Sequence, residues 1–292
     1  MTRQHSARNT QAAVNFNPYH DLFWEVTQLK TITLPLAPDS KAYLQGYLRD
    51  PAEDTGTYPA IIIVPGGNYT HIPEQQAEDL ALAWSARGYQ AFFLRYSFVD
   101  EQTPLLPAPV VELAKGVALL RRNADNWQID TEHIFVAGFS VGGHITALFN
   151  DLWHDEAFNK LARTTPYEIK PRAVILSYPV ITPADGYPTD AAMLASWTDD
   201  PAKIAADKLV NSRNVATFIW ATAEDPLVPV QNALDYAQAS IANHVDTELH
   251  IFHQGPHGLA LANQVTAWKP GTALPHVAHW LNLAEEWLHE LD

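Results

Sequence analysis

Apolar positions along this chain fall into short continuous runs that are separated by segments with helical spacing. The first run covers residues 60–64 (Ala-Ile-Ile-Ile-Val) and stops at a Pro-Gly-Gly turn. A continuous run of β-branched residues is typical of a strand buried on both faces of a parallel sheet. Helical spacing follows over residues 74–87 up to Gly88, and a second apolar run covers residues 91–94. This order predicts one β-α-β unit.

The same alternation continues toward the C-terminus. We expect strands over residues 133–137, 173–177, 215–221 and 248–252, and helices over 110–123, 230–243 and 275–291, with one more helix that begins after Ser140. Ahead of the first unit, residues 29–36 and 42–48 predict an antiparallel pair of edge strands around a polar turn. The pattern therefore predicts an α/β fold with a mostly parallel central sheet and helices on both faces.

The chain is expected to form a polar leader over residues 1–28 and a single domain over residues 29–292, a length that α/β folds often use as one unit. Residues 182–214 break the alternation, because they are mixed in polarity and rich in Asp, Ala and Pro. This segment follows a strand end, where α/β sheets bind their ligands, so we expect a small cap-like insertion over the site. A plain surface excursion explains the composition equally well.

Composition argues against several kinds of partner and chemistry. The 33 acidic and 18 basic side chains give a net charge of −15, and no run of Lys or Arg is dense enough to follow phosphates. We therefore expect neither nucleic acid nor a membrane surface as a partner. The absence of cysteine removes disulfides, thiolate nucleophiles and Cys-ligated zinc. No apolar stretch suits a secretory signal or the roughly 18 to 20 residues of a membrane span, which predicts a soluble, cytoplasmic protein.

The most informative motif is Gly-Phe-Ser-Val-Gly-Gly-His at residues 138–144. It follows a predicted strand and opens a predicted helix, which is the setting of a nucleophile elbow. The serine of an elbow lies in a strained turn, so glycine two positions before and after it removes side chains that would clash. A further glycine, Gly143, lets the new helix pack close to the sheet. Ser140 is the candidate nucleophile, although Gly-x-Ser-x-Gly also occurs by chance in ordinary turns.

A serine nucleophile needs a base and an orienting acid. The best acid is Asp225, which follows the strand predicted over residues 215–221, and Glu224 is its neighbouring rival. The best base is His257, which lies in a Gly-Pro-His-Gly loop after the last predicted strand. The order Ser140, Asp225, His257 is the order of nucleophile, acid and base in α/β-hydrolases.

Two other histidines compete with His257 as the base. His250 lies within the last predicted strand and His253 at its end, so His257 has the freer loop position. His144, directly after the elbow, is expected to be a packed or capping side chain. No metal is expected, because the Gly-Pro pair between His253 and His257 prevents a helical two-histidine face and no other ligand motif is present. The predicted chemistry needs no cofactor.

A tetrahedral oxyanion needs backbone donors near the serine. The Pro-Gly-Gly-Asn-Tyr loop at residues 65–69 follows the first buried strand, so the N–H groups of Gly67 and Asn68 are candidate donors, together with that of Val141. A turn that merely connects strand to helix is the alternative for this loop. The candidate pocket residues are the aromatic side chains of Tyr69, Tyr96 and Tyr178, chosen from a wider set that also includes Trp84, Trp197 and Trp220.

These motifs resemble those of small α/β-hydrolase esterases of the acetyl-xylan and feruloyl esterase type, which are close to the hormone-sensitive-lipase-like carboxylesterases. The resemblance extends from about residue 61 to the C-terminus and rests on segments 65–69, 95–97, 127–130, 138–144, 178–180, 225–229 and 255–258. It implies the α/β-hydrolase fold and assigns the same residues to the nucleophile, acid, base and oxyanion hole. One departure is Pro-Gly-Gly-Asn where many relatives have His-Gly-Gly-Gly, so Asn68 is expected to adopt a conformation that glycine takes more easily.

The leading hypothesis is hydrolysis of short-chain carboxylic esters through an acyl-enzyme on Ser140. The resemblance implies a small-molecule ester substrate and, as one candidate class, acylated carbohydrates such as acetylated sugars. Two alternatives remain open: an amide-cleaving serine hydrolase of the peptidase or formamidase type, and a non-catalytic relative that binds a small ligand. The sequence also leaves open whether the protein forms homo-oligomers.

Overall fold

The computed structural model describes residues 29–49 and 56–291. In this part of the chain one eight-stranded sheet lies at the centre, with strand order β1-β2-β4-β3-β5-β6-β7-β8. The strands are β1 (Lys30–Pro35), β2 (Tyr43–Leu48), β3 (Tyr58–Val64), β4 (Gln90–Arg95), β5 (Ile129–Phe139), β6 (Ala173–Ser177), β7 (Ala216–Thr222) and β8 (Thr247–Phe252). β1 pairs with β2 and β2 with β4 in antiparallel fashion, and every other pair is parallel. The predicted mostly parallel sheet and its antiparallel edge are confirmed.

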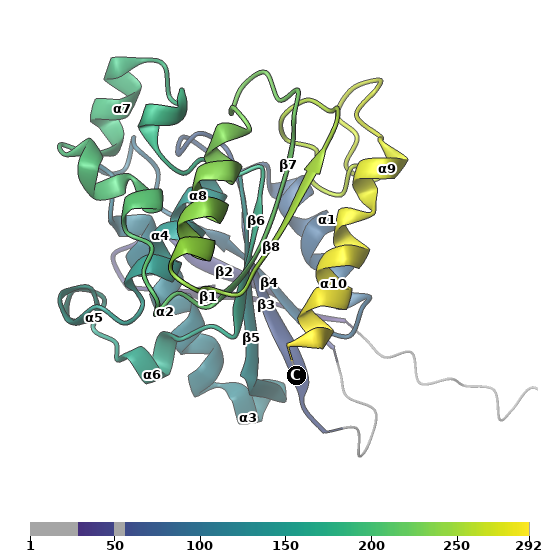
Figure 1. Cartoon of the computed structure of the whole chain (residues 1–292). Coiled ribbons are helices and arrows are strands. Elements are labelled where there is room, and N and C mark those ends of the chain that lie inside the picture. The colour runs from purple at the N-terminus through teal and green to yellow at the C-terminus, as the bar shows by residue number, and fades with distance from the viewer. Residues whose placement is uncertain (1–28, 50–55, 292) are drawn as a thin grey trace, which may run out of the picture.

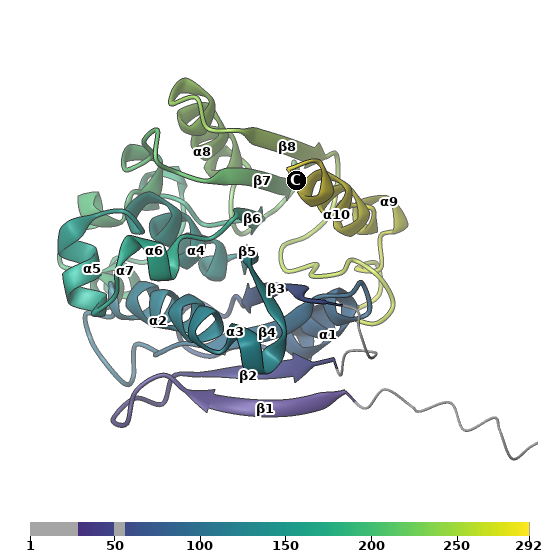
Figure 2. The ribbon, with the colours of Figure 1, turned by 90° about the horizontal axis from the view of Figure 1, so that it is seen from below.

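Helices cover both faces of this sheet, as the sequence pattern predicted (Figure 1). One face of the sheet is covered by α1 (Glu74–Ser85), α9 (Pro275–Ala278) and α10 (Trp280–Glu290). The other face is covered by α2 (Ala108–Arg122), α4 (Val141–Leu152) and α8 (Gln231–Ala242), and Figure 2 shows the two layers from below. Residues 60–64 of β3 and the whole of β6 are buried, because helices shield both faces of these strands. This arrangement is the α/β-hydrolase fold, and it places the strand ends that carry the candidate site along one edge of the sheet.

Some elements differ from the sequence predictions. The helix expected over residues 275–291 is two consecutive helices, α9 and α10, with His279 between them. β5 is longer than the predicted strand at both ends and covers eleven residues. Three short helices were not predicted: α3 (Ala124–Trp127), α5 (Glu156–Ala162) and α6 (Pro166–Ile169). One or two helical turns give too few repeats for the spacing of apolar residues to reveal them. The predicted leader over residues 1–28 lies outside the described residues.

Residues 182–214 form α7 (Ala191–Trp197) and three short 3₁₀ segments rather than a strand-helix unit. This segment, called the cap segment below, is tied to the body by backbone hydrogen bonds from Leu105 N to Ser196 O (3.0 Å) and from Leu106 N to Trp197 O (2.9 Å). Trp197 has no exposed surface. The cap segment is therefore packed against the domain, while its role over the site stays a prediction. No helix within residues 29–49 and 56–291 is both long and apolar enough to cross a bilayer.

Candidate active site

Ser140 occupies a sharp turn between β5 and α4. Its backbone has φ 56° and ψ −121°, a conformation that costs a non-glycine residue about 1 to 3 kcal/mol. Neighbouring backbone holds it there, because Ser140 N donates to Ser177 O and Val180 N donates to Ser140 O, both at 3.1 Å. This backbone geometry is that of the nucleophile elbow expected from the sequence.

The glycines around Ser140 are required by close backbone approaches. A Cβ atom at Gly138 would lie 2.3 Å from Gly142 O, and one at Gly142 would lie 2.0 Å from Val64 O at the end of β3. The predicted reason for the glycines is confirmed at both positions. At Gly143 the close neighbour is Pro179, with 2.6 Å between the added Cβ and the proline Cβ, so this glycine admits the segment after β6 rather than a strand of the sheet.

The structure brings Ser140, Asp225 and His257 together from three separate strand ends. His257 Nε2 lies 2.7 Å from Ser140 Oγ, and His257 Nδ1 lies 2.6 Å from Asp225 Oδ2. Nδ1–H donates to the carboxylate, so Nε2 keeps its lone pair and accepts a hydrogen bond from the Ser140 hydroxyl. The other carboxylate oxygen of Asp225 accepts from the N–H groups of Leu227 (2.9 Å) and Val228 (3.1 Å), which fixes the acid in place.

The rival residues lie elsewhere. Glu224 is exposed, and the carboxylate bonded to His257 Nδ1 is that of Asp225. His250 bonds to Glu248 on its own strand, with 2.6 Å between Nε2 and Oε1. His253 is exposed and its ring lies 6.0 Å from that of His276. In the described part of the chain, no three His, Cys, Asp or Glu side chains are grouped as metal ligands would be.

Loop 65–69 lies directly beside the serine. A Cβ atom added to Gly66 would lie 3.0 Å from Ser140 Cβ and 3.6 Å from its Oγ. The loop then passes through three consecutive positive φ angles, 123° at Gly67, 57° at Asn68 and 61° at Tyr69. The expected glycine-like conformation of Asn68 is thus confirmed. Val141, on the opposite side of the elbow, is the first residue of α4, so its N–H has no partner within the helix.

The three candidate pocket tyrosines are buried in the region of loop 65–69 and His257. Tyr96 OH donates to Pro65 O (3.0 Å) and Gly66 O (3.1 Å) and therefore holds the loop. Tyr178 OH accepts from Ala260 N (3.1 Å), and its ring packs edge-on against His257 at 5.0 Å. Burial raises the pKa of both hydroxyls, so both stay protonated. Tyr69 and Tyr96 have no exposed surface and Tyr178 has 4%, so these rings are placed to support the site rather than to line a pocket.

His144 has a larger place in the site than the sequence suggested. It is completely buried, and its Nδ1 lies 3.0 Å from Tyr69 OH while its Nε2 lies 2.7 Å from Ile204 O. Burial lowers its pKa to about 4, so the ring is neutral at pH 7. The expectation of a packed side chain is confirmed, but its bonds to two distant segments carry no local signal in the sequence.

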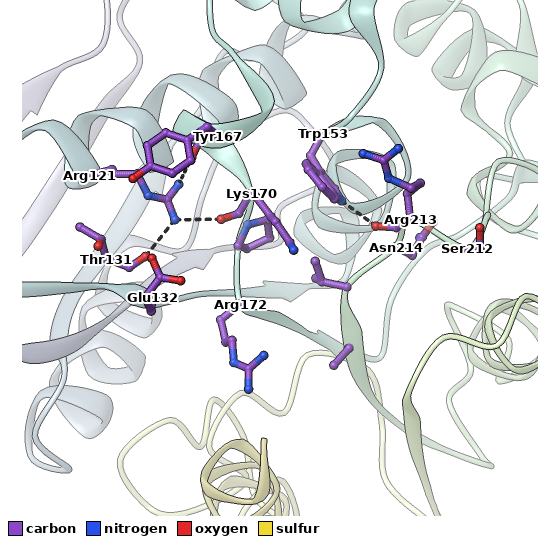
Figure 3. Close-up of a pocket in the computed structure, with 13 residues that line it drawn as sticks. Arg121, Thr131, Glu132, Trp153, Tyr167, Lys170, Arg172, Ser212, Arg213 and Asn214 are labelled. Carbon is purple, nitrogen blue, oxygen red and sulfur yellow. Dashed lines mark hydrogen bonds between the residues drawn. The ribbon is translucent and has the colours of Figure 1, made fainter. Parts of the chain in front are cut away.

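A cavity of about 510 Å³ lies at the opposite edge of the sheet, among segments that precede β6 and β7 (Figure 3). Its lining includes Arg121, which donates to the carbonyl oxygens of four residues at 2.8 to 3.0 Å, namely Thr131, Tyr167, Glu168 and Lys170. None of the lining residues belongs to the serine, acid, base or loop described above. Sequence reasoning did not predict this cavity, because its residues come from five separate segments of the chain.

The sheet, the elbow and the chain order of Ser140, Asp225 and His257 define an α/β hydrolase. Within that class the chain belongs to the BD-FAE family, whose model matches residues 47–239. The resemblance to esterases of this kind, inferred from the motifs, is thereby confirmed.

Solved structures and a curated relative agree with this membership. The carboxylesterase Cest-2923 from Lactobacillus plantarum WCFS1 is similar with a TM-score of 0.83 and 33% identity, covering 90% of this chain and 97% of that one. A carboxylesterase candidate from the same organism has 48% identity and a TM-score of 0.75, with coverage of 90% and 99%. An acetylxylan esterase of Xylanibacter ruminicola is 27% identical over 78% of this chain and 46% of its own length. The chain spans about half, or less, of the length of the curated relatives that it matches.

Proposed function

We propose that this protein is a serine carboxylesterase that hydrolyses short-chain acyl esters through an acyl-enzyme on Ser140. The observation that carries the proposal is the continuous relay from Asp225 Oδ2 to His257 Nδ1 at 2.6 Å and from His257 Nε2 to Ser140 Oγ at 2.7 Å. These three side chains have the geometry that a serine activated by a general base requires. Family membership and esterase relatives support the same assignment.

In the acylation step, Ser140 Oγ attacks the ester carbonyl while His257 Nε2 takes the hydroxyl proton. The resulting imidazolium is stabilised by Asp225, which stays ionised, and then donates the proton to the leaving alcohol. In the deacylation step His257 removes a proton from water, which attacks the acyl group, and then donates that proton to Ser140 Oγ as the acyl bond breaks and the acid leaves. The relay thus serves as base and acid in turn without any further group.

The developing oxyanion is assigned to backbone N–H groups on both sides of Ser140. Val141 offers an N–H at the start of α4, where the helix dipole also favours negative charge. Gly67 and Asn68 offer N–H groups from a loop that passes within van der Waals distance of the serine. Each such donor contributes about 3 to 4 kcal/mol to transition-state stabilisation in related chemistry.

Restricted access to the serine supports a small acyl group. Ser140 is 7% exposed, and the side chains of His257 and Asp225 are 13% and 1% exposed. Where a longer acyl chain has to displace packed side chains, the cost is about 1 to 3 kcal/mol. Acetylated carbohydrates are the proposed substrate class, since the acetylxylan esterase relative is named for such a substrate.

The acyl preference can be measured directly with a series of p-nitrophenyl esters. We expect kcat/KM to be highest for acetyl and propionyl esters and to fall by about 10-fold or more at octanoyl, because the longer chain cannot enter without repacking. Acetylated xylo-oligosaccharides run beside the panel test the sugar preference. Equal rates from acetyl to octanoyl would contradict the short-acyl assignment, while hydrolysis of acetyl esters but not acetylated sugars would contradict only the carbohydrate class.

A further inference from the structure

Loop 65–69 is a strained segment in the proposed oxyanion hole. Asn68 and Tyr69 both have positive φ, at 57° and 61°, directly after Gly67 at 123°. Non-glycine residues keep such a conformation only where their surroundings over-determine it. The side chains of Asn68 and Tyr69 each lead, by hydrogen bonds, to the cap segment, which is far away in the sequence.

The first connection runs through Tyr187 of the cap segment. Its hydroxyl donates to Asn68 Oδ1, and the tyrosine is 5% exposed. Its ring packs against that of Trp197, with 5.9 Å between the ring centroids. Tyr187 therefore approaches the loop from a packed position within the cap segment.

The second connection runs through His144. Ile204 O, also in the cap segment, can only accept, so the His144 Nε2 atom that lies 2.7 Å away must carry the hydrogen. In the neutral ring Nδ1 is then an acceptor, and Tyr69 OH donates to it at 3.0 Å. The direction of each bond in the series Tyr69, His144, Ile204 is thus fixed by chemistry.

An aromatic contact joins the two connections. Trp197, which is fully buried, packs edge-on against Tyr69 with 4.9 Å between ring centroids, and its ring lies 6.3 Å from that of His144. The cap segment thus contacts both strained residues of the loop, one through Tyr187 and the other through His144 and Trp197.

We propose that the cap segment positions the oxyanion loop, and that Tyr187 and His144 are positioning residues for the reaction. This inference rests on the proposed function. Backbone donors stabilise an oxyanion only when they are held within a few tenths of an ångström of the required place, so loss of either connection relaxes the loop and weakens the donors. The cap segment is then part of the catalytic machinery rather than a freely opening lid.

The test removes one hydroxyl from each connection and keeps the rings. We expect Tyr187→Phe and Tyr69→Phe each to lower kcat for p-nitrophenyl acetate by about 10-fold, while KM changes by less than about 2-fold, because the loss falls on the transition state. The affinity for an alkylboronic acid, which forms a tetrahedral adduct with the serine, should fall in parallel with kcat. A purely structural role would lower the melting temperature without this parallel.

Tyr47→Phe serves as the matched control. Tyr47 OH donates to Glu78 Oε1 at 3.0 Å, a bond between β2 and α1 that does not touch the loop, so kcat should be unchanged. Unaltered kcat and boronate affinity in Tyr187→Phe and Tyr69→Phe would overturn the positioning role while leaving the esterase assignment intact. Absence of esterase activity in the unsubstituted protein would overturn both.

The cavity of Figure 3 has a positively charged lining. Four cationic side chains, from Arg121, Lys170, Arg172 and Arg213, line it beside one acidic side chain, Glu132. This reverses the balance of the whole chain, in which acids outnumber bases by 33 to 18. Among the ion pairs formed by described residues, none includes these four cations.

Three of these cations contact uncharged groups. Arg121 is fixed by backbone carbonyl oxygens rather than by an ion pair, and the nearby Glu132 carboxylate offsets only part of its charge through space. Lys170 and Arg213 lie near the ring of Trp153, with Nζ at 5.5 Å and Cζ at 5.8 Å from its centroid. Like charges gathered in a concave surface concentrate the field and attract anions.

We also infer that this cavity binds a small organic polyanion. Its volume of about 510 Å³ falls in the range of small-molecule sites. The cavity would recognise a compact molecule that carries several anionic oxygen atoms. Both phosphate compounds and polycarboxylates have this chemistry, so one probe of each kind distinguishes between them.

Calorimetry with pyrophosphate and with citrate tests this site. We expect at least one probe to bind with a Kd below about 1 mM, and Lys170→Ala combined with Arg213→Ala to weaken binding by about 10-fold without changing ester hydrolysis. The control combines Lys30→Ala with Lys269→Ala, which removes the same charge away from the cavity. Failure of both probes to bind below about 5 mM, or equal weakening in the control, would overturn the inference.

Discussion

Replacement of Ser140 by alanine is expected to lower kcat for p-nitrophenyl acetate by about 10⁴-fold or more, because it removes the hydroxyl that lies 2.7 Å from His257 Nε2 and is proposed to form the acyl-enzyme. Labelling by a fluorophosphonate should disappear in the same variant. The fold should persist, since the alanine keeps the Cβ atom and the backbone bonds to Ser177 and Val180. Rates and labelling are measured beside thermal unfolding.

Ser212→Ala is the matched control for Ser140→Ala, because Ser212 is an exposed serine at the rim of the distant cavity of Figure 3 and does not contact the residues around Ser140. It should keep both full activity and labelling. Substantial ester hydrolysis by Ser140→Ala, at more than about 1% of the unsubstituted rate, would exclude Ser140 as the nucleophile. Activity without labelling in the unsubstituted protein would argue for a different mechanism altogether.

Substitution of Asp225 by asparagine should lower kcat by about 10⁴-fold while the fold is kept. The asparagine can still accept from the N–H groups of Leu227 and Val228 through its carbonyl oxygen, so the loop stays closed. The amide that then faces His257 Nδ1 donates rather than accepts, which places the ring hydrogen on Nε2. Nε2 can no longer accept the proton of Ser140, and no charge stabilises the imidazolium.

Glu224→Gln is the control for this variant. It removes one negative charge from the adjacent position, where the side chain is exposed, and should leave kcat within about 2-fold, because an exposed charge is well screened. A comparable loss in both variants would mean that net charge near the loop, rather than the bond to His257, determines the rate. A loss in Glu224→Gln alone would transfer the role of the acid to Glu224.

The fold and the order of the site were accessible from the sequence because their signals are local. A parallel strand buried on both faces needs a continuous apolar run, as at residues 60–64, and an elbow needs glycine where a Cβ would lie 2.0 to 2.3 Å from backbone atoms, as at Gly138 and Gly142. Asp225 and His257 each follow a predicted strand, and the carboxyl ends of parallel strands lie at one edge of a sheet, so their positions in the chain predicted their proximity to Ser140.

Only the tertiary structure showed which residues support loop 65–69. Nothing near Tyr69 in the sequence shows that its hydroxyl bonds to a histidine 75 positions later, or that Tyr187 reaches Asn68 across 119 positions. An aromatic residue has the same local pattern whether it lines a pocket or supports a loop, and only its burial in the folded chain separates the two.

The sequence by itself determined the class of fold, the nucleophile elbow and the candidates for acid and base, because each depends on the conformation that a short stretch of residues can adopt. Only the tertiary structure decided that the cap segment contacts the strained loop, that His144 is a neutral bridge, and that cations gather at the far edge. Those features depend on contacts between distant residues, which close only when the whole sheet and its helices are assembled.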